Sequence, residues 1–230
     1  ESPLVNALPA WTPDARANVT LPLAERVALV RVLGGWLTEG AFAPYETDDF
    51  VRVDMEKGSL KYAYSMLWGR VDPVVKAGLE PVFVWENVPW GFVENNTYAS
   101  GVYGCVRGPA DARALALYSE FARDVAAALA DRYGHGKVAR WQHRVHSEPN
   151  SQNHWLDGPA AYLRMYAAVT RGVRQALGPD VNIGPAHFKT RPKDDVEYIV
   201  GHLGMLAATD ADGRADKTSA PETLATAAAA

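Results

Sequence analysis

WQHRVHSEPN, residues 141–150, is the stretch of sequence that decides the fold. Its apolar part continues a run that begins at Val138, and we expect a strand over residues 138–145. Glu148 follows the end of that strand, just ahead of a proline and an asparagine. A carboxylate in this position can donate a proton to a substrate, or it can simply cap a loop or the start of a helix.

Elements of two kinds alternate on both sides of this stretch. We expect strands over residues 28–33, 79–85, 138–145 and 181–188, and helices over residues 59–78, 111–134 and 160–178. Asp111 is the expected N-cap of the second helix. Such alternation is typical of a parallel sheet, either an open doubly wound sheet or a TIM barrel. Neither a GxGxxG nor a GxxxxGKS/T pattern follows the first strand, which excludes the usual dinucleotide and P-loop folds.

The first strands and the residues around Glu148 also resemble a known family. Residues 133–188 are similar to glycoside hydrolase family 39, which contains β-xylosidases and α-L-iduronidase, and the ordered resemblance extends over about residues 25–190. The residues that carry it are Trp141, Glu148, Pro149, Asn150, Trp155, Tyr162, Tyr166, Gly184 and Pro185. The resemblance implies an α/β fold, the (β/α)8 TIM barrel, and a retaining mechanism on an oligo- or polysaccharide with Glu148 as the general acid/base.

The sequence shown accounts for only part of such a barrel. Four strands are expected, whereas a closed barrel has eight. We expect residues 1–205 to form the barrel portion and residues 206–230 to be a low-complexity tail or an incompletely known segment. The nucleophilic Glu of the family lies on the seventh strand, and neither Glu197 nor Glu222 stands in a comparable position. A further chain segment or a subunit would have to complete the barrel.

Three residues depart from the pattern of the family. Ser147 stands where the family has an Asn that bonds the sugar 2-hydroxyl, His146 replaces a Trp, and Leu33 stands where a His is usual. These departures favour the alternative function, a non-catalytic barrel that serves as a carbohydrate-binding or structural part of an extracellular assembly.

Further residues near the expected strand ends are candidates for sugar contacts. Glu86 and Asn87 follow the expected strand at residues 79–85 and could bind sugar hydroxyls. Tryptophans after strand ends can stack on a pyranose. The ordinary roles of such residues are hydrogen bonding within a loop and packing in the core. The candidate substrate-binding residues are Trp36, Glu86, Asn87, Trp90, His146, Ser147, Asn150 and His187.

Composition narrows the class of protein. The net charge is −4 and no long basic run occurs, so the sequence shows no basic surface for binding nucleic acid. No apolar stretch is long enough to span a membrane. The single Cys105 permits no internal disulfide. The spacing of His135, His143, His146 and His154 matches no metal-ligand pattern, so we expect neither a metal nor a cofactor. Asn18 and Asn95 begin glycosylation sequons, which favours a secreted or cell-surface protein with carbohydrate as its partner.

Overall fold

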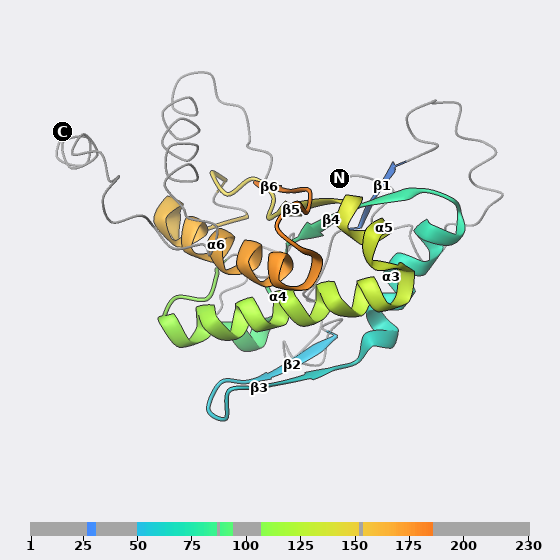
Figure 1. The fold of residues 1–230 in the computed structure, drawn as a ribbon. Coiled ribbons are helices and arrows are strands. Elements are labelled where there is room, and N and C mark those ends of the chain that lie inside the picture. Colours follow the sequence, from blue (N-terminus) through green and yellow to red (C-terminus); the bar gives the residue numbers. More distant parts are fainter. Residues whose placement is uncertain (1–26, 31–49, 87, 94–106, 152–153, 186–230) are drawn as a thin grey trace, which may run out of the picture.

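Parallel strands form the central sheet of the protein. The computed structural model describes residues 27–30, 50–86, 88–93, 107–151 and 154–185. In these ranges the strands β1 (Val27–Val30), β4 (Glu80–Trp85), β5 (Gln142–Val145) and β6 (Ile183–Pro185) pair in the order β1-β4-β5-β6, and every pair is parallel (Figure 1). The predicted parallel sheet is therefore confirmed, and helices separate its strands along the chain.

Helices cover one face of this sheet. The helices are α3 (Tyr64–Lys76), α4 (Ala112–Tyr133), α5 (His135–Arg140) and α6 (Gly158–Leu177), with a short 3-10 turn η3 (Trp90–Phe92). The side chain of Asp111 accepts a hydrogen bond of 2.8 Å from the backbone N–H of Ala114, so the predicted cap of α4 is confirmed. A Cβ added to Gly172 of α6 would lie 2.1 Å from the backbone oxygen of Ser119, which shows how closely α4 and α6 pack.

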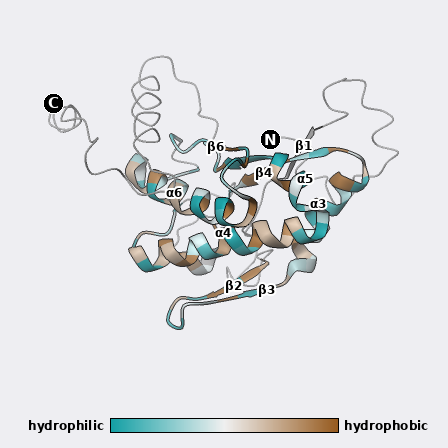
Figure 2. Cartoon of the chain, viewed as in Figure 1, coloured by the Kyte–Doolittle hydropathy of each residue, from teal (hydrophilic) through white to brown (hydrophobic). Residues whose placement is uncertain are grey.

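The alternation of side chains along β4 divides the sheet into two faces. Trp85 is fully buried and meets Phe121 of α4 edge-on, with ring centroids 6.5 Å apart. Phe83, two residues earlier in β4, and its register partner His143 lie on the same face, with ring centroids 5.1 and 6.2 Å from that of Trp85. Glu86 follows Trp85 directly, and the alternation of extended backbone would place its side chain on the opposite face. The helices α4 and α6 each carry both hydrophobic and hydrophilic residues (Figure 2), as expected of helices that bury one stripe.

Two predicted boundaries are wrong. Residues 59–62 were expected to begin a helix, but they form β3 (Ser59–Tyr62), which pairs antiparallel with β2 (Val51–Asp54). This hairpin packs on α4: Tyr62 hydrogen-bonds Asp124 at 2.9 Å, and its ring lies against Phe121, which also meets Trp85 of the sheet. In addition, residues 138–140 belong to α5, and the strand begins only at Gln142.

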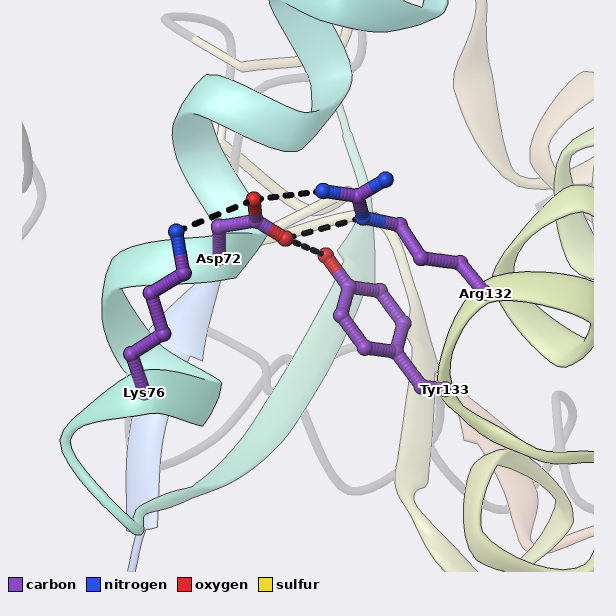
Figure 3. Close-up of polar contacts among 4 residues, drawn as sticks. All are labelled: Asp72, Lys76, Arg132 and Tyr133. Atoms are coloured by element: carbon purple, nitrogen blue, oxygen red, sulfur yellow. Dashed lines mark hydrogen bonds and ion pairs between the residues drawn. The ribbon is translucent and has the colours of Figure 1, made fainter.

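A cluster of polar side chains ties α3 to α4. Asp72 accepts hydrogen bonds from Arg132 at 2.9 and 2.6 Å and from the hydroxyl of Tyr133 at 2.6 Å, and Lys76 lies 3.5 Å away (Figure 3). We call these four residues the Asp72 cluster. The hydrogen bonds from Arg132 hold the pKa of Asp72 at about 2, so the carboxylate stays ionised. The guanidinium of Arg132 also lies over the ring of Trp68, 4.8 Å from its centroid.

Some expectations concern residues outside the described ranges. These are the low-complexity segment 206–230, the departure at Leu33, and Cys105. Within the described ranges, no helix combines the length and the apolar character that crossing a bilayer requires.

Candidate active site

The register of the sheet brings two glutamates to one edge. Trp85, the last residue of β4, pairs with Val145, the last residue of β5, and Val145 pairs with Pro185 at the end of β6. The chain therefore leaves all three strands at the same level. Glu86 follows β4 directly, and Glu148 stands three residues beyond β5. The carboxyl edge of parallel strands is where the active sites of barrel enzymes lie.

The backbone that carries Glu148 has an unusual conformation. The N–H of His146 still bonds the carbonyl of Trp85 at 3.0 Å, as if the strand continued. His146 then has φ 69° and Glu148 has φ 44°. Among the described residues, these two are the ones other than glycine with positive φ. Left-handed backbone costs a non-glycine residue about 1–2 kcal/mol, and such conformations gather at functional sites.

Two successive turns then return the chain to Glu148. The N–H of Ser151 bonds the carbonyl of Glu148 at 2.8 Å, and the N–H of His154 bonds the carbonyl of Ser151 at 2.9 Å. These turns bring the imidazole of His154 between the two glutamates. Its Nδ1 lies 3.6 Å from Oε1 of Glu86, and its Nε2 lies 3.6 Å from Oε2 of Glu148. We call these three residues the Glu86–His154–Glu148 cluster.

Burial falls off along this cluster. The side chains of Glu86 and His154 are 6% and 8% exposed, whereas that of Glu148 is 27% exposed. Of the two carboxyl groups, Glu148 is thus the one open to a molecule from outside. Glu86 is closed in against the imidazole, so its contacts serve the interior of the site.

Aromatic rings pack against the loop after β5. The ring of His146 meets Trp155 edge-on at 5.0 Å, and the hydroxyl of Tyr162 donates to the carbonyl of Val145 at 2.9 Å. The indole N–H of Trp155 donates to the carbonyl of Gly158 at 2.8 Å. A Cβ added to Gly108 would lie 2.3 Å from the Trp155 ring, so only glycine fits beside it. The rings therefore fix the loop that carries Glu148 and His154.

A second contact joins this loop to the segment before α4. Asp157 pairs with the guanidinium of Arg107 and accepts a hydrogen bond of 3.0 Å from the N–H of Gly108. The segment that enters α4 and the loop that enters α6 are thus held together beside the cluster.

The predicted site residues fall into two groups. Glu86, His146, Ser147, Glu148 and Asn150 lie together at the carboxyl edge of β4 and β5. His146 and Ser147 are buried, each 1% exposed, and their contact with sugar stays a prediction. Trp90 lies in η3, at the same end of β4. The predicted residues Trp36, Asn87, His187, Asn18 and Asn95 lie outside the described residues.

One residue of the cluster was missed from the sequence. His154 was considered only as a metal ligand, but its two ring nitrogens face carboxylates. The available signal was the turn-forming run Pro149-Asn150-Ser151, which predicts that the chain folds back on Glu148 soon after passing it. In the part of the chain that the structure describes, no group of three His, Cys, Asp or Glu side chains could hold a metal ion.

Comparison with known proteins identifies relatives of this arrangement. The model of the family "Glycosyl hydrolases family 39" matches residues 27–202. The GH39 enzyme from Xanthomonas axonopodis pv. citri has 21% sequence identity and a TM-score of 0.51, covering 66% of this chain and 29% of its own. A bacterial orthologue of human α-L-iduronidase has 15% identity and a TM-score of 0.53, covering 74% of this chain and 24% of its own. A comparison with curated protein sequences finds no match.

These solved structures establish the fold. The described strands are part of a (β/α)8 barrel, as the resemblance implied, and they provide the carboxyl edge of that part. The chain spans only about a quarter of the length of the bacterial orthologue of iduronidase, with 24% of that chain covered.

Proposed function

Because the chain belongs to glycosyl hydrolase family 39, we propose that the protein cleaves glycosidic bonds with retention of configuration and that Glu148 is the general acid/base. The observation that carries this proposal is the geometry of Glu148. It follows β5 at the carboxyl edge of the sheet, has φ 44°, and is more exposed than the other members of its cluster. This is the position and the accessibility that a proton donor to a bound sugar needs.

The proposed reaction has two steps. In the first, the protonated carboxyl of Glu148 gives its proton to the glycosidic oxygen while a second carboxylate attacks the anomeric carbon. The bond between that carbon and the glycosidic oxygen breaks, the alcohol leaves, and a covalent glycosyl-enzyme remains. In the second, the Glu148 carboxylate takes a proton from water, and the resulting hydroxide displaces the second carboxylate with return of the original configuration. The substrate class is an oligo- or polysaccharide.

The second carboxylate of this mechanism belongs to another part of the barrel. Retaining glycosidases have the two carboxyl groups about 5–5.5 Å apart. Glu86 does not meet this need, because its carboxylate is buried behind the imidazole of His154 rather than open to the sugar. The resemblance assigns the nucleophile to the seventh strand, and we propose that a further chain segment or subunit supplies it together with the remaining strands.

One observation favours a second function, a carbohydrate-binding barrel without catalysis. Ser147 stands where the resemblance calls for an Asn that reaches the sugar 2-hydroxyl, and its short side chain is 1% exposed. That hydrogen bond strengthens in the transition state, so its loss would weaken catalysis more than binding. A sugar that binds to the natural protein without being cleaved would support this function.

The direct test is the variant Glu148→Gln in the protein at its full natural length. Gln keeps the size of the side chain but donates no acidic proton, so turnover of an unactivated alkyl glycoside should fall about 10²–10⁴-fold. Circular dichroism should show the same fold and similar thermal stability. The matched control is Asp72→Asn, the same change of group at a carboxylate remote from the site, which should leave turnover unaltered. Unchanged turnover in Glu148→Gln would remove the proposed role.

We further propose that the protein is secreted or lies at the cell surface, and that it carries N-linked glycans at Asn18 and Asn95. The support is the pair of sequons together with a carbohydrate-active family. Secretion from a eukaryotic host should give a product whose mass falls after enzymatic removal of N-glycans. Replacing both asparagines with Gln should abolish that change in mass, and an unglycosylated secreted product would contradict the proposal for glycosylation.

A further inference from the structure

We propose that His154 is a positioning residue for Glu148, held in place by Glu86. The proposal rests on the proposed role of Glu148 and adds two residues to it. The imidazole lies 3.6 Å from one oxygen of each glutamate, through a different ring nitrogen in each case. When one ring nitrogen of a histidine contacts a buried carboxylate, the orientation of the ring is fixed, and so is the direction of the other nitrogen.

The buried end of the cluster gives the ring its orientation. Glu86 is 6% exposed and follows the last residue of β4, so its position is set by the sheet. With Nδ1–H directed to that carboxylate, Nε2 of His154 presents its lone pair to Glu148. Contacts of 3.6 Å are slightly longer than hydrogen bonds, and catalytic contacts commonly tighten when substrate is bound.

The arrangement gives the carboxyl of Glu148 a fixed neighbour. When the contact tightens, the O–H of a protonated Glu148 can donate to Nε2 of His154, so the carboxyl keeps its orientation.

The conformation of the loop explains why Glu148 needs such a partner. Its backbone has φ 44° and its side chain is 27% exposed, so its carboxylate is less closely packed than that of Glu86, which is 6% exposed. A displacement of about 1 Å at a catalytic group can cost on the order of a hundredfold in rate. The ring of His154, 8% exposed and following the two turns after Glu148, is placed to limit such a displacement.

The experiment is a double-mutant cycle with His154→Phe and Glu148→Gln, measured as kcat/KM on an unactivated alkyl glycoside, whose departure needs the general acid. His154→Phe should lower kcat/KM by up to about a hundredfold when Glu148 is present, chiefly through kcat, and should have no effect in the Glu148→Gln background. Glu86→Gln, an isosteric change, should reproduce a smaller part of the loss. The control is His143→Phe, at a buried histidine that bonds the backbone carbonyl of Val138 instead.

Equal losses from His154→Phe in both backgrounds, or no loss in either, would overturn the positioning role. Full turnover in Glu148→Gln would instead overturn the proposed function, so the two failures are distinct.

A spectroscopic measurement on the protein at its full natural length tests these contacts without an activity assay. The ¹⁵N signals of the His154 ring, assigned from the His154→Phe spectrum, should change at Nδ1 in Glu86→Gln and at Nε2 in Glu148→Gln. Neither should change in His143→Phe. Ring signals of His154 that are indifferent to both glutamate substitutions would contradict the proposal even if the variants lower activity.

Discussion

Two carboxylates of this protein are held by very different partners. Asp72 is gripped by a guanidinium and a phenol, at hydrogen-bond distances of 2.6–2.9 Å, and its pKa is lowered to about 2. Glu148 faces an imidazole at 3.6 Å on a left-handed backbone. Arg132 cannot give up its proton, so it locks Asp72 as an anion, whereas a histidine can both take and return one. The first arrangement suits a structural tie and the second suits acid/base chemistry.

The largest difference between the two regions should appear when their supporting tryptophans are removed. Trp155 is 3% exposed and packs on the loop of Glu148, so Trp155→Ala should destabilise the protein by about 3–5 kcal/mol. Trp68 is only partly buried, among Tyr64, Arg132 and Tyr133, so Trp68→Ala should cost less, roughly 1–2 kcal/mol. Urea unfolding of both variants measures this. Equal losses would mean that the site loop is no better packed than the Asp72 cluster.

His143 is a third kind of titratable group. It is fully buried, and its ring contacts the backbone carbonyl of Val138. Burial lowers the pKa of its ring from 6.5 to about 4. The unfolded chain therefore takes up the proton first, and stability declines as the pH falls from about 6.5 to about 4. The contribution is on the order of 3 kcal/mol. Unfolding free energies measured between pH 7 and pH 4 should fall less steeply in His143→Phe. An identical slope in both proteins would mean that the pKa of His143 is not lowered in the folded protein.

The smallest effect should come from the Asp72 cluster itself. Asp72→Asn removes a partly exposed ion pair, and we expect a loss of about 1 kcal/mol with no change in turnover. Because the pKa of Asp72 is lowered in the folded state, its stabilisation is present above pH 3.8, the ordinary value, and is lost as the pH falls through about 2. Thermal unfolding of Asp72→Asn and the natural protein should converge in that range. A gap that persists at pH 2 would show a contribution other than charge.

Local patterns in the sequence were sufficient to predict most strands of the parallel sheet. The continuous apolar run at residues 80–85 and the helical stripe of α4 each identify their elements without any partner. The hairpin was missed because the apolar residues Leu60, Tyr64 and Leu67 happen to have helical spacing. What makes residues 59–62 a strand is their pairing with β2 and packing on α4, and neither contact is visible in a local window.

The candidate site was predicted to a similar extent. Glu148 could be found because its position relative to a strand is a local property. His154 could not, because its role depends on two turns that reverse the chain and on Glu86, which comes from another strand. The exposed fraction that separates Glu148 from Glu86 is likewise a product of the whole fold.

The measurement that tests the central claim most directly is the dependence of the Glu148→Gln rate on the leaving group. General acid assistance matters for a poor leaving group and is dispensable for one that departs readily as an anion. The account predicts that Glu148→Gln loses about 10²–10⁴-fold on an alkyl glycoside yet still releases dinitrophenolate from an activated glycoside in a rapid first turnover. An equal loss on both substrates, or no loss on either, would contradict the assignment of Glu148 as the acid/base.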